Sequence, residues 1–506
     1  MRFDPPLGVF AARYDAGEAQ VVWTTLVADL ETPVSAFLKV ASGKANTFLL
    51  ESVEGGSARG RYSMIGLAPD LIWKCRGETA AINRDALESP DAFEPANEPP
   101  LDSLRRLIAE SRIDDMPKEL PPMAAGIFGY LGYDMVRLME KLPEPNPDRA
   151  DLDDATLIRP TILLIFDSVR DEITVVTPVR PDPSLTARMA LDRAVNRLTD
   201  ILDTLDRPVP KTDAAPATAL PVASPASNTT PDEFKEMVAK AKEYIAAGDI
   251  FQVVLSQRFE SDFDLPAFAL YRALRRVNPA PFLVYLDFGH FQIVSSSPEI
   301  LVRLRGGKVT IRPLAGTRRR GATEAEDIAL GAELLADQKE LAEHLMLLDL
   351  GRNDVGRVAR VGTVEVTDKF FLERFSHVMH IVSNVEGQLS ADHDALSALV
   401  AGFPAGTVSG APKVRAMEII DELEKDKRGV YAGCVGYFSA NGDMDNCIAL
   451  RTSVIKDGRM YVQAGAGIVA DSVPESEHEE CVNKAKALFR AAEEAVRFAS
   501  SAGRGQ

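Results

Sequence analysis

The sequence predicts an α+β fold of two large domains in a chain of 506 residues. A chain of this length exceeds what one hydrophobic core usually supports. The dipeptides Asn441-Gly442 and Asp457-Gly458 lie between runs of β-forming residues, as the turns of antiparallel hairpins do. Helix-starting signals such as Thr230-Pro231-Asp232-Glu233 occur between other strand-like runs. Together these patterns indicate a chain that contains both antiparallel strands and helices.

The composition excludes several classes of protein. A net charge of −18 argues against a nucleic-acid partner, although a local basic pocket could still bind a small anion. The four cysteines have no paired spacing, so neither a disulfide framework nor a zinc knuckle is indicated. No basic and apolar leader opens the chain, and no apolar run approaches the ~20 residues of a membrane span. We therefore expect a cytoplasmic protein without a membrane or nucleic-acid partner.

A proline- and alanine-rich stretch divides the chain. Residues 207–229 contain five prolines among Ala, Ser and Thr, which leaves little to bury and predicts a linker. Residues 1–206 are then the N-terminal domain and residues 230–500 the C-terminal domain.

Two helix starts are predicted in the second domain. Thr230 and Glu233 form a capping box, and Gly248 is expected to end that helix. A second capping box at Thr323 and Glu326 predicts a helix that extends to Leu348.

Between these helices, Pro298 ends a strand-like run over residues 292–297, and Glu299 follows it directly. A side chain just past a strand end can point into a cleft. A lone glutamate in such a place is more often a solvated loop residue, so both readings stay open here.

The stretch from Tyr431 to Lys484 is the most informative. It predicts a meander of about three strands. On its middle strand, over residues 447–454, one face carries Arg451 among small neighbours, which suits an anion lying on the sheet. The next strand ends in Gly465-Ala466-Gly467, and two glycines inside a strand indicate close approach of a ligand or backbone.

Carboxylates recur at helical spacing in two places. Glu340 and Glu343 form one pair, and Glu477 and Glu480 form another on one face with Lys484. Such a pair is usually a solvated face. Two pairs facing each other across a cleft would suit a hard cation such as Mg²⁺, which prefers oxygen ligands.

Other motifs carry weaker signals. His377 and His380 have HxxH spacing, but no third soft ligand is placed near them, so zinc and a metallohydrolase are disfavoured. The string GFPAGTVSGAPK, over residues 402–413, fails the P-loop pattern, although Thr407 could still offer its hydroxyl to an anion.

Several long strings, in order, resemble the large, chorismate-binding subunits of anthranilate synthases. They are LLES (Leu49 to Ser52), RPLAGTRRRG (Arg312 to Gly321), KELAEHLMLLDLGRND (Lys339 to Asp354), VMHIVS (Val378 to Ser383), FPAGTVSGAPKVRAMEII (Phe403 to Ile420) and the stretch from Tyr431 to Lys484. The resemblance covers nearly the whole chain. It implies the chorismate-utilising fold, with two subdomains that each have a large, mainly antiparallel sheet flanked by helices.

The resemblance also implies a reaction. In that family, ammonia adds to the ring of chorismate, the ring hydroxyl leaves, and pyruvate is eliminated to give anthranilate, with Mg²⁺ as cofactor. Glu340, Glu343, Glu477 and Glu480 match the metal site. Glu299 matches the general acid, His380 the residue of pyruvate elimination, and Thr317 a further catalytic contact. The residues that match substrate contacts are Gly316, Thr407, Tyr431, Arg451, Gly465, Ala466, Gly467 and Lys484.

Two positions separate the relatives of this family. Isochorismate and salicylate synthases have a lysine base where this chain has Gln252. Aminodeoxychorismate synthases typically have a lysine where it has Ala315. Both favour anthranilate as the product. Aminodeoxychorismate synthase component I stays as the alternative, and a catalytically silent module that binds tryptophan is a further one.

Regulation and partners follow from the same resemblance. The family's tryptophan pocket matches Leu50, Glu51, Ser52, Asn278, Pro279, Pro281 and Phe282. Ala280 and Phe282 lack two hydroxyls that the family's turn usually carries, so the response to L-tryptophan could be altered. None of the cysteines has the setting of a glutaminase nucleophile. We therefore expect a separate glutamine amidotransferase subunit (component II), in a heterotetramer of two large and two small subunits.

Overall fold

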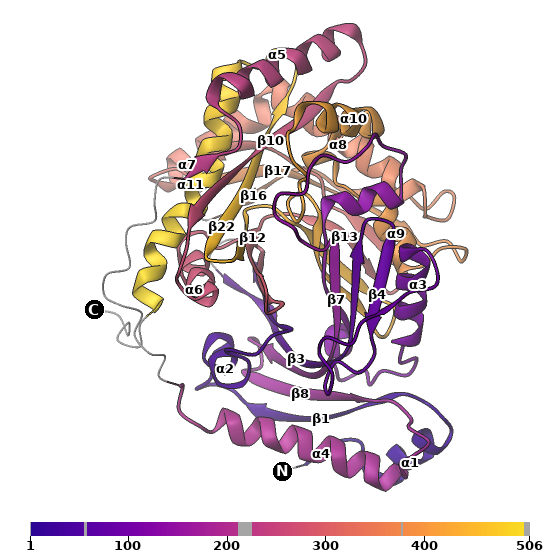
Figure 1. Ribbon diagram of the computed structural model, residues 1–506. Coiled ribbons are helices and arrows are strands. Elements are labelled where there is room, and N and C mark those ends of the chain that lie inside the picture. Colours follow the sequence, from indigo (N-terminus) through magenta and orange to yellow (C-terminus); the bar gives the residue numbers. More distant parts are fainter. Residues whose placement is uncertain (1, 55–57, 211–224, 376–377, 500–506) are drawn as a thin grey trace.

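The computed structural model describes residues 2–54, 58–210, 225–375 and 378–499. Every strand pairing in this part of the chain is antiparallel, and the helices lie on the outer faces of the sheet (Figure 1). The predicted α+β fold with mainly antiparallel sheets is therefore confirmed. The strands form one connected network with two arms.

The first arm runs from β1 to β10. Its strands, in spatial order, are β1 (Gln20–Val27), β8 (Glu172–Val179), β7 (Ala155–Asp167), β3 (Ala58–Arg76), β2 (Thr47–Glu54), β11 (Phe282–Asp287), β12 (Gln292–Ser297), β21 (Thr452–Lys456), β22 (Arg459–Ile468) and β10 (Gln252–Asp262). Two short strands, β9 (Ala226–Ser227) and β18 (Gly410–Ala411), also pair with β10.

The second arm shares β3 and β7 with the first. From its edge it runs β5 (Glu94–Pro95), β4 (Thr79–Asn83), β3, β7, β6 (Gly126–Leu131), β19 (Cys434–Ser439), β20 (Met444–Ile448), β13 (Ile300–Arg305), β14 (Lys308–Ile311) and β17 (Val378–Gln388). Both β15 (Leu314–Arg319) and β16 (Glu365–Arg374) pair with β17.

The long strands β3 and β7 pass from one arm to the other. Their register shifts between Pro69 and Leu71, and Ala68 just before has a φ of +52°. The arms pack face to face, since Phe48 of β2 stacks on Phe128 of β6 with ring centroids 4.7 Å apart. Both arms mix strands from before and after the predicted linker, because β2 pairs with β11 and β6 with β19. The proposed domain limits stay predictions, and residues 211–224 of the linker lie outside the described part.

The helices cover the two arms. The core of the first arm lies beneath α1 (Leu7–Asp15), α2 (Pro33–Val40), α4 (Ala187–Leu205), α6 (Ala267–Val277) and α11 (Pro474–Ala499). That of the second involves α3 (Pro100–Glu110), α5 (Pro231–Ala247), α8 (Gln338–Gly356), α9 (Ala395–Gly402) and α10 (Lys413–Leu423). Short 3-10 turns occur at η1 (Pro122–Ala124), η2 (Tyr133–Leu138) and η3 (Gly406–Val408). In Figure 1, α4 lies beneath β1 and β8 at one end, and α5 and α11 lie together at the other.

Both predicted hairpins form, but the strand between them differs from expectation. Asn441-Gly442 joins β19 to β20, and Asp457-Gly458 joins β21 to β22. Four strands form in place of three, because the chain leaves the ladder between Ile448 and Thr452. Arg451 has a φ of +47° there, a conformation that no regular strand contains. The prediction that Arg451 lies within a continuous strand was wrong.

The predicted helix starts are also confirmed in part. Thr230 and Glu233 form the full capping box of α5, and Gly248 ends it at a φ of +85°. Thr323 caps α7 (Glu324–Ala336), but the predicted capping box is incomplete, because the Glu326 carboxylate accepts from the Ala322 N–H instead of the Thr323 N–H. The helix ends at Ala336 instead of continuing to Leu348. Asp337 interrupts it and caps α8, because its carboxylate accepts hydrogen bonds from the backbone N–H groups of Lys339 and Glu340.

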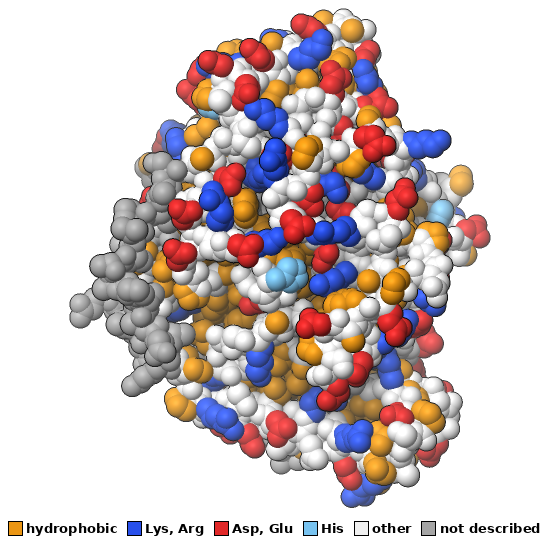
Figure 2. Space-filling model, in the orientation of Figure 1, with side chains coloured by type: hydrophobic (Ala, Val, Ile, Leu, Met, Phe, Trp, Pro, Cys, Tyr) orange, Lys and Arg blue, Asp and Glu red, His pale blue; other side chains and the backbone are white. Residues whose placement is uncertain are grey.

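The surface carries both charges. On the face shown in Figure 2, acidic and basic side chains are intermixed, and a depression in the lower half exposes hydrophobic side chains. Among the helices that the structure describes, none has an apolar segment long enough to cross a membrane.

Candidate active site

A cavity of about 750 Å³ collects most of the residues that the sequence predicted for the site. Its walls come from β10, β15, β17, β22, α8, α11, the η3 turn and the loops after β12 and β20. The predicted residues that line it are Glu299, Gly316, Thr317, Glu343, His380, Thr407, Tyr431, Arg451, Gly465, Gly467, Glu480 and Lys484.

Glu299 follows β12 at the inner wall of this cavity and is buried. Thr407 donates a hydrogen bond to its Oε1 at 3.2 Å. Burial raises the pKa of the Glu299 carboxyl to about 8, even though the Thr407 hydrogen bond opposes the shift. The loop reading of this glutamate is therefore excluded, and Glu299 carries a proton at neutral pH.

His380 is on β17, directly opposite Thr317 of β15. Its Nδ1 lies 2.9 Å from the carbonyl oxygen of Gly316 and 3.1 Å from the Thr317 hydroxyl. A carbonyl only accepts, so Nδ1 carries the proton and Nε2 is left as an acceptor. Nε2 has no partner among the described residues. Burial lowers the pKa of His380 to about 4, which keeps the imidazole neutral.

Arg451 supplies an unpaired cation. No acidic side chain in the described part of the chain pairs with its guanidinium, and burial lowers its pKa. A buried charge without a partner is costly, so this arginine is suited to bind an anion. The left-handed backbone at Arg451 is the strained conformation often found at functional sites.

Two glycines of β22 keep the wall next to Arg451 open. A Cβ atom on Gly465 would lie 2.8 Å from the Tyr431 hydroxyl, and one on Gly467 would lie 2.8 Å from Nε2 of Gln252. The same Cβ on Gly465 would lie 2.7 Å from the backbone carbonyl oxygen of Leu255, so Gly465 excludes a side chain, which is the close approach that the sequence indicated. At Gly467 only the end of the flexible Gln252 side chain would have to move. Ala466 between them has no exposed surface and packs into the core, so it does not line the cavity.

The four predicted metal carboxylates lie on α8 and α11. Glu343 and Glu480 line the cavity, whereas Glu340 and Glu477 do not. Gln252 donates to Glu343 at 3.0 Å, Arg318 pairs with Glu340 at 3.1 Å, and Lys484 pairs with Glu480 at 2.7 Å.

These carboxylates fit a hard cation in one respect. Burial raises the pKa of Glu343, and the charges of Glu340 and Glu480 raise it further; burial and Glu480 do the same for Glu477. Mutual repulsion of this kind would be relieved by a divalent cation. Within the described residues no three acidic or soft ligands converge on one point. The arrangement therefore fits Mg²⁺ held by one or two carboxylates together with oxygens of a substrate.

A second cavity of about 530 Å³ adjoins the first, and the two share Pro298, Glu299 and Leu314. Of the residues predicted to bind tryptophan, Leu50, Glu51, Ser52, Pro281 and Phe282 line this second cavity, whereas Asn278 and Pro279 line the larger one. The Glu51 carboxylate accepts from Tyr271 at 2.5 Å and from Arg275 at 2.7 and 2.9 Å. It therefore holds β2 to α6.

Sequence reasoning missed several residues of the site. Arg318 pairs with Glu340, Glu333 and Asp337, and Phe375, Gln463 and Asn483 line the larger cavity. Arg318 could have been found, because it lies next to Thr317 in the string RPLAGTRRRG. The others carry no motif. His377, the partner of His380 in the HxxH spacing, lies outside the described residues.

The whole sequence has clear relatives. A sequence model of the chorismate-binding enzymes matches residues 46–490. The chain belongs to the family of chorismate-binding enzymes.

Among curated members of this family, the anthranilate synthase component 1 of Cereibacter sphaeroides is 60% identical, covering 98% of this chain and 99% of that protein. The anthranilate synthase component 1 of Pseudomonas aeruginosa is 47% identical, covering 92% of this chain and 94% of that protein. The expected resemblance to this subunit is thus confirmed over nearly the full length.

Solved structures agree with the fold. The anthranilate synthase component I of Streptococcus pneumoniae superimposes with a TM-score of 0.75 at 37% identity, covering 92% of this chain and 99% of that one. The isochorismate synthase MenF of Escherichia coli shares the fold, with a TM-score of 0.70 at 20% identity, and covers 94% of this chain and 95% of its own. The chorismate-utilising fold is therefore confirmed.

Proposed function

We propose that this chain is the chorismate-binding subunit of an anthranilate synthase, and that it converts chorismate and ammonia to anthranilate and pyruvate in tryptophan biosynthesis. One observation carries the proposal: the buried, protonated carboxyl of Glu299 and the guanidinium of Arg451, which has no acidic partner among the described residues, line the same cavity. Such a cavity combines a proton donor with an anion-binding group. The relatives of similar length support the same assignment.

Arg451 binds one carboxylate of chorismate in this proposal. Its planar fork can donate to both oxygens. The Tyr431 hydroxyl lies beside Gly465, next to the place where such a carboxylate would sit, and Lys484 donates to the carbonyl of Gly465 at 2.9 Å. These groups orient the enolpyruvyl side of the substrate before any bond changes.

Glu299 then acts as the general acid. Its proton goes to the ring hydroxyl, which leaves as water while ammonia bonds to the ring. The neutral His380, whose Nδ1–H is fixed on the Gly316 carbonyl, offers Nε2 as a base near the ring when pyruvate is eliminated and the ring becomes aromatic. The Thr317 hydroxyl lies 3.1 Å from the same nitrogen, Nδ1, and helps to fix the orientation of the ring.

Mg²⁺ would be held by Glu343 and Glu480, with Glu340 and Glu477 behind them. When bound, it supplies Lewis-acid polarisation of a substrate carboxylate. The lysine and arginine that pair with these carboxylates, Lys484 and Arg318, balance part of their charge in its absence.

Two positions favour anthranilate over related products. Ala315 is 7% exposed and offers no ammonium or nucleophile, and Gln252 is an amide bound to Glu343 instead of a lysine base. The alternative, an aminodeoxychorismate synthase component I, would place the amino group at ring position 4 instead of position 2.

The ammonia would come from a separate glutaminase subunit. All four cysteines are buried, and burial raises the pKa of each thiol, to about 12 for Cys75 and Cys447. A nucleophilic cysteine needs a lowered pKa and access to substrate. This chain therefore supplies the chorismate site of a cytoplasmic assembly, which we propose is a heterotetramer with component II.

Feedback inhibition by L-tryptophan would use the smaller cavity. A ligand there would contact the turn before β11, and Ser296 donates to the Asn278 carbonyl of that turn at 2.5 Å. Ala280 is buried and Phe282 has no hydroxyl, so the affinity for tryptophan is expected to differ from that of relatives with polar residues there. Titration of the activity with tryptophan measures this affinity.

The proposed function is tested by product analysis. The purified chain is mixed with chorismate, Mg²⁺ and ammonium, and the products are separated against 2-aminobenzoate and 4-aminobenzoate-precursor standards. We expect anthranilate and pyruvate in equal amounts. Chorismate that is consumed without anthranilate would favour the aminodeoxychorismate or isochorismate reaction, and chorismate left intact would contradict an ammonia-dependent activity.

A further inference from the structure

A buried arginine outside the cavity contacts three of the elements that line it. The side chain of Arg428 lies after α10 and is 1% exposed. Its guanidinium donates to both carboxylate oxygens of Glu424, at 2.5 and 2.9 Å, and to the carbonyls of Val408 at 2.7 Å and Val254 at 2.6 Å. With these donors engaged, the plane of the guanidinium is fixed.

The two partner carbonyls belong to the cavity wall. Val254 of β10 and Val408 of η3 both line the larger cavity, and Thr407 directly before Val408 donates to Glu299. Glu424 is also bound by the backbone N–H and the hydroxyl of Ser256, each at 2.8 Å. Arg428 therefore ties β10 to the turn that contacts the general acid.

Two tyrosine rings lie against Arg428. The guanidinium carbon is 4.8 Å from the ring centroid of Tyr133 and 5.6 Å from that of Tyr431. Both distances are within the range of cation–π contacts, which arginine makes well because its guanidinium is flat. Tyr431 lines the cavity, whereas Tyr133 belongs to η2, before the predicted linker.

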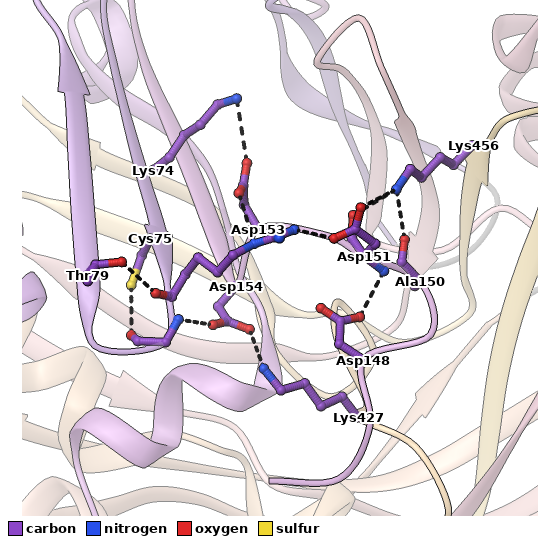
Figure 3. Close-up of polar contacts among 12 residues, drawn as sticks. Lys74, Cys75, Thr79, Asp148, Ala150, Asp151, Asp153, Asp154, Lys427 and Lys456 are labelled. Carbon is purple, nitrogen blue, oxygen red and sulfur yellow. Dashed lines mark hydrogen bonds and ion pairs between the residues drawn. The ribbon is translucent and has the colours of Figure 1, made fainter. Parts of the chain in front are cut away.

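The segment around Tyr133, which does not line the cavity, contacts residues 427–429. The Tyr133 N–H donates to the Gly429 carbonyl at 2.7 Å, and the Gly429 N–H donates to Asp134 at 3.1 Å. Figure 3 shows Lys427 directed at Asp154, 3.4 Å away. It also shows Lys456, on the neighbouring β21, bound to Asp151 and Ala150 of the same loop. The first part of the chain thus fixes the segment that carries Tyr431.

We propose that Arg428 and Tyr133 are positioning residues for the substrate site. The ring of Tyr133, from the first part of the chain, packs against Arg428 and fixes its position. Arg428 in turn fixes the orientation of the Tyr431 ring, so that the Tyr431 hydroxyl lies beside Gly465. The identity of the ligand as chorismate rests on the proposed function. The consequence is that a residue in η2, which does not line the cavity, controls substrate binding through Tyr431.

The phenolic oxygen of Tyr133 provides a matched control. It is buried and has no hydrogen-bond partner among the described residues. Tyr133→Phe therefore keeps the aromatic face on Arg428 and removes only an unpaired hydroxyl. Tyr133→Met removes the face but retains a flexible apolar side chain that can fill the space. Arg428→Lys is a second variant, which keeps the charge opposite Glu424 and loses the flat fork.

The test is a double-mutant cycle on chorismate binding. The dissociation constant is measured by calorimetry with Mg²⁺ and without ammonium, for the wild type, Tyr133→Met, Tyr431→Phe and the double variant. We expect Tyr431→Phe to weaken binding about tenfold, the effect of one hydrogen bond to a charged group. Tyr133→Met should weaken it about fivefold, Arg428→Lys should act in the same direction, and Tyr133→Phe should bind as the wild type does.

The double variant decides whether Tyr133 acts through Tyr431. If it does, Tyr133→Met adds no further loss in the Tyr431→Phe background. Losses that multiply, or wild-type binding in Tyr133→Met, would overturn the proposal. A general structural defect would lower the kcat and leave the KM values for chorismate and ammonium unchanged, whereas positioning raises the KM for chorismate alone. A wild type that binds chorismate but makes no anthranilate would contradict only the proposed function.

Discussion

At the scale of single residues, the site depends on how burial shifts two pKa values in opposite directions. The Glu299 carboxyl and the His380 imidazole both become neutral because the cavity disfavours charge. Glu299 thereby keeps a proton to donate, and His380 keeps a free nitrogen to accept one. Arg451 keeps its charge in the same cavity, so the binding of an anion beside it is favourable.

Removing the acid should separate activity from stability. In Glu299→Gln, we expect kcat to fall at least about 100-fold, because general acid catalysis contributes that much. The fold should not suffer. Glu299 has a higher pKa in the folded than in the unfolded state, so its ionisation destabilises the fold increasingly as the pH rises from about 4.5 to about 8. Thermal unfolding at pH 8 should show a variant at least as stable as the wild type; a clear drop in its midpoint would contradict this.

The same pKa sets the alkaline limit of activity. The reactive form has Glu299 protonated, so kcat/KM for chorismate should fall as the pH rises through about 8, about tenfold for each pH unit beyond it. The profile is measured with the concentration of free ammonia held constant, so that ionisation of ammonium does not contribute. A profile that stays flat to pH 10 would exclude Glu299 as the acid.

At the scale of elements, the start of α8 places two of the carboxylates that we propose bind Mg²⁺. Asp337 ends the preceding helix, caps α8 and pairs with Arg318 at 2.8 Å. Glu340 and Glu343 follow in the first two turns, so the direction in which they point depends on where this helix begins. The sequence showed the capping box at Thr323 but not this second start, because Asp337 lies within a pattern that looks continuous.

Loss of this cap should therefore affect both stability and substrate binding. Asp337→Ala is expected to lower the free energy of unfolding by about 1 kcal/mol, as loss of an N-cap does. It should also raise the KM for chorismate. Thr323→Ala removes the cap of α7, which carries no residue of the cavity, and should lower stability alone. The two variants are compared by thermal unfolding and steady-state kinetics, and an equal KM in both would refute the link between cap and site.

At the scale of the whole molecule, the cavity lies where distant parts of the chain meet. The β2–β11 and β6–β19 pairings join the two parts of the chain. The residues that line the cavity come from separate elements of the second part, between Gln252 and Leu488. The alternation and turn signals predicted the antiparallel strands, and the motifs predicted twelve of the residues that line the cavity. The interleaving of strands was not predictable, because no local pattern states which strand a distant strand will join. The turn at Ala449 to Arg451 and the packing of Arg428 were missed for the same reason.

Removal of the metal tests whether the activity depends on Mg²⁺ held between the two carboxylate pairs. EDTA should lower anthranilate formation at least about 100-fold, because the Lewis acid is worth several kcal/mol, and added Mg²⁺ should restore it. The circular dichroism spectrum should not change, since the carboxylates already have partners in Arg318, Gln252 and Lys484. Glu480→Gln should need more Mg²⁺ for half-maximal rate. Full activity in the chelator would contradict a metal role.

The most direct test of the central claim is a crystal structure of Glu299→Gln with chorismate and Mg²⁺, because this variant should bind the substrate without turning it over. We predict chorismate in the cavity of about 750 Å³, with one carboxylate on Arg451 and the ring hydroxyl facing position 299. Chorismate bound elsewhere, or with both carboxylates remote from Arg451, would contradict the assignment of this cavity as the active site.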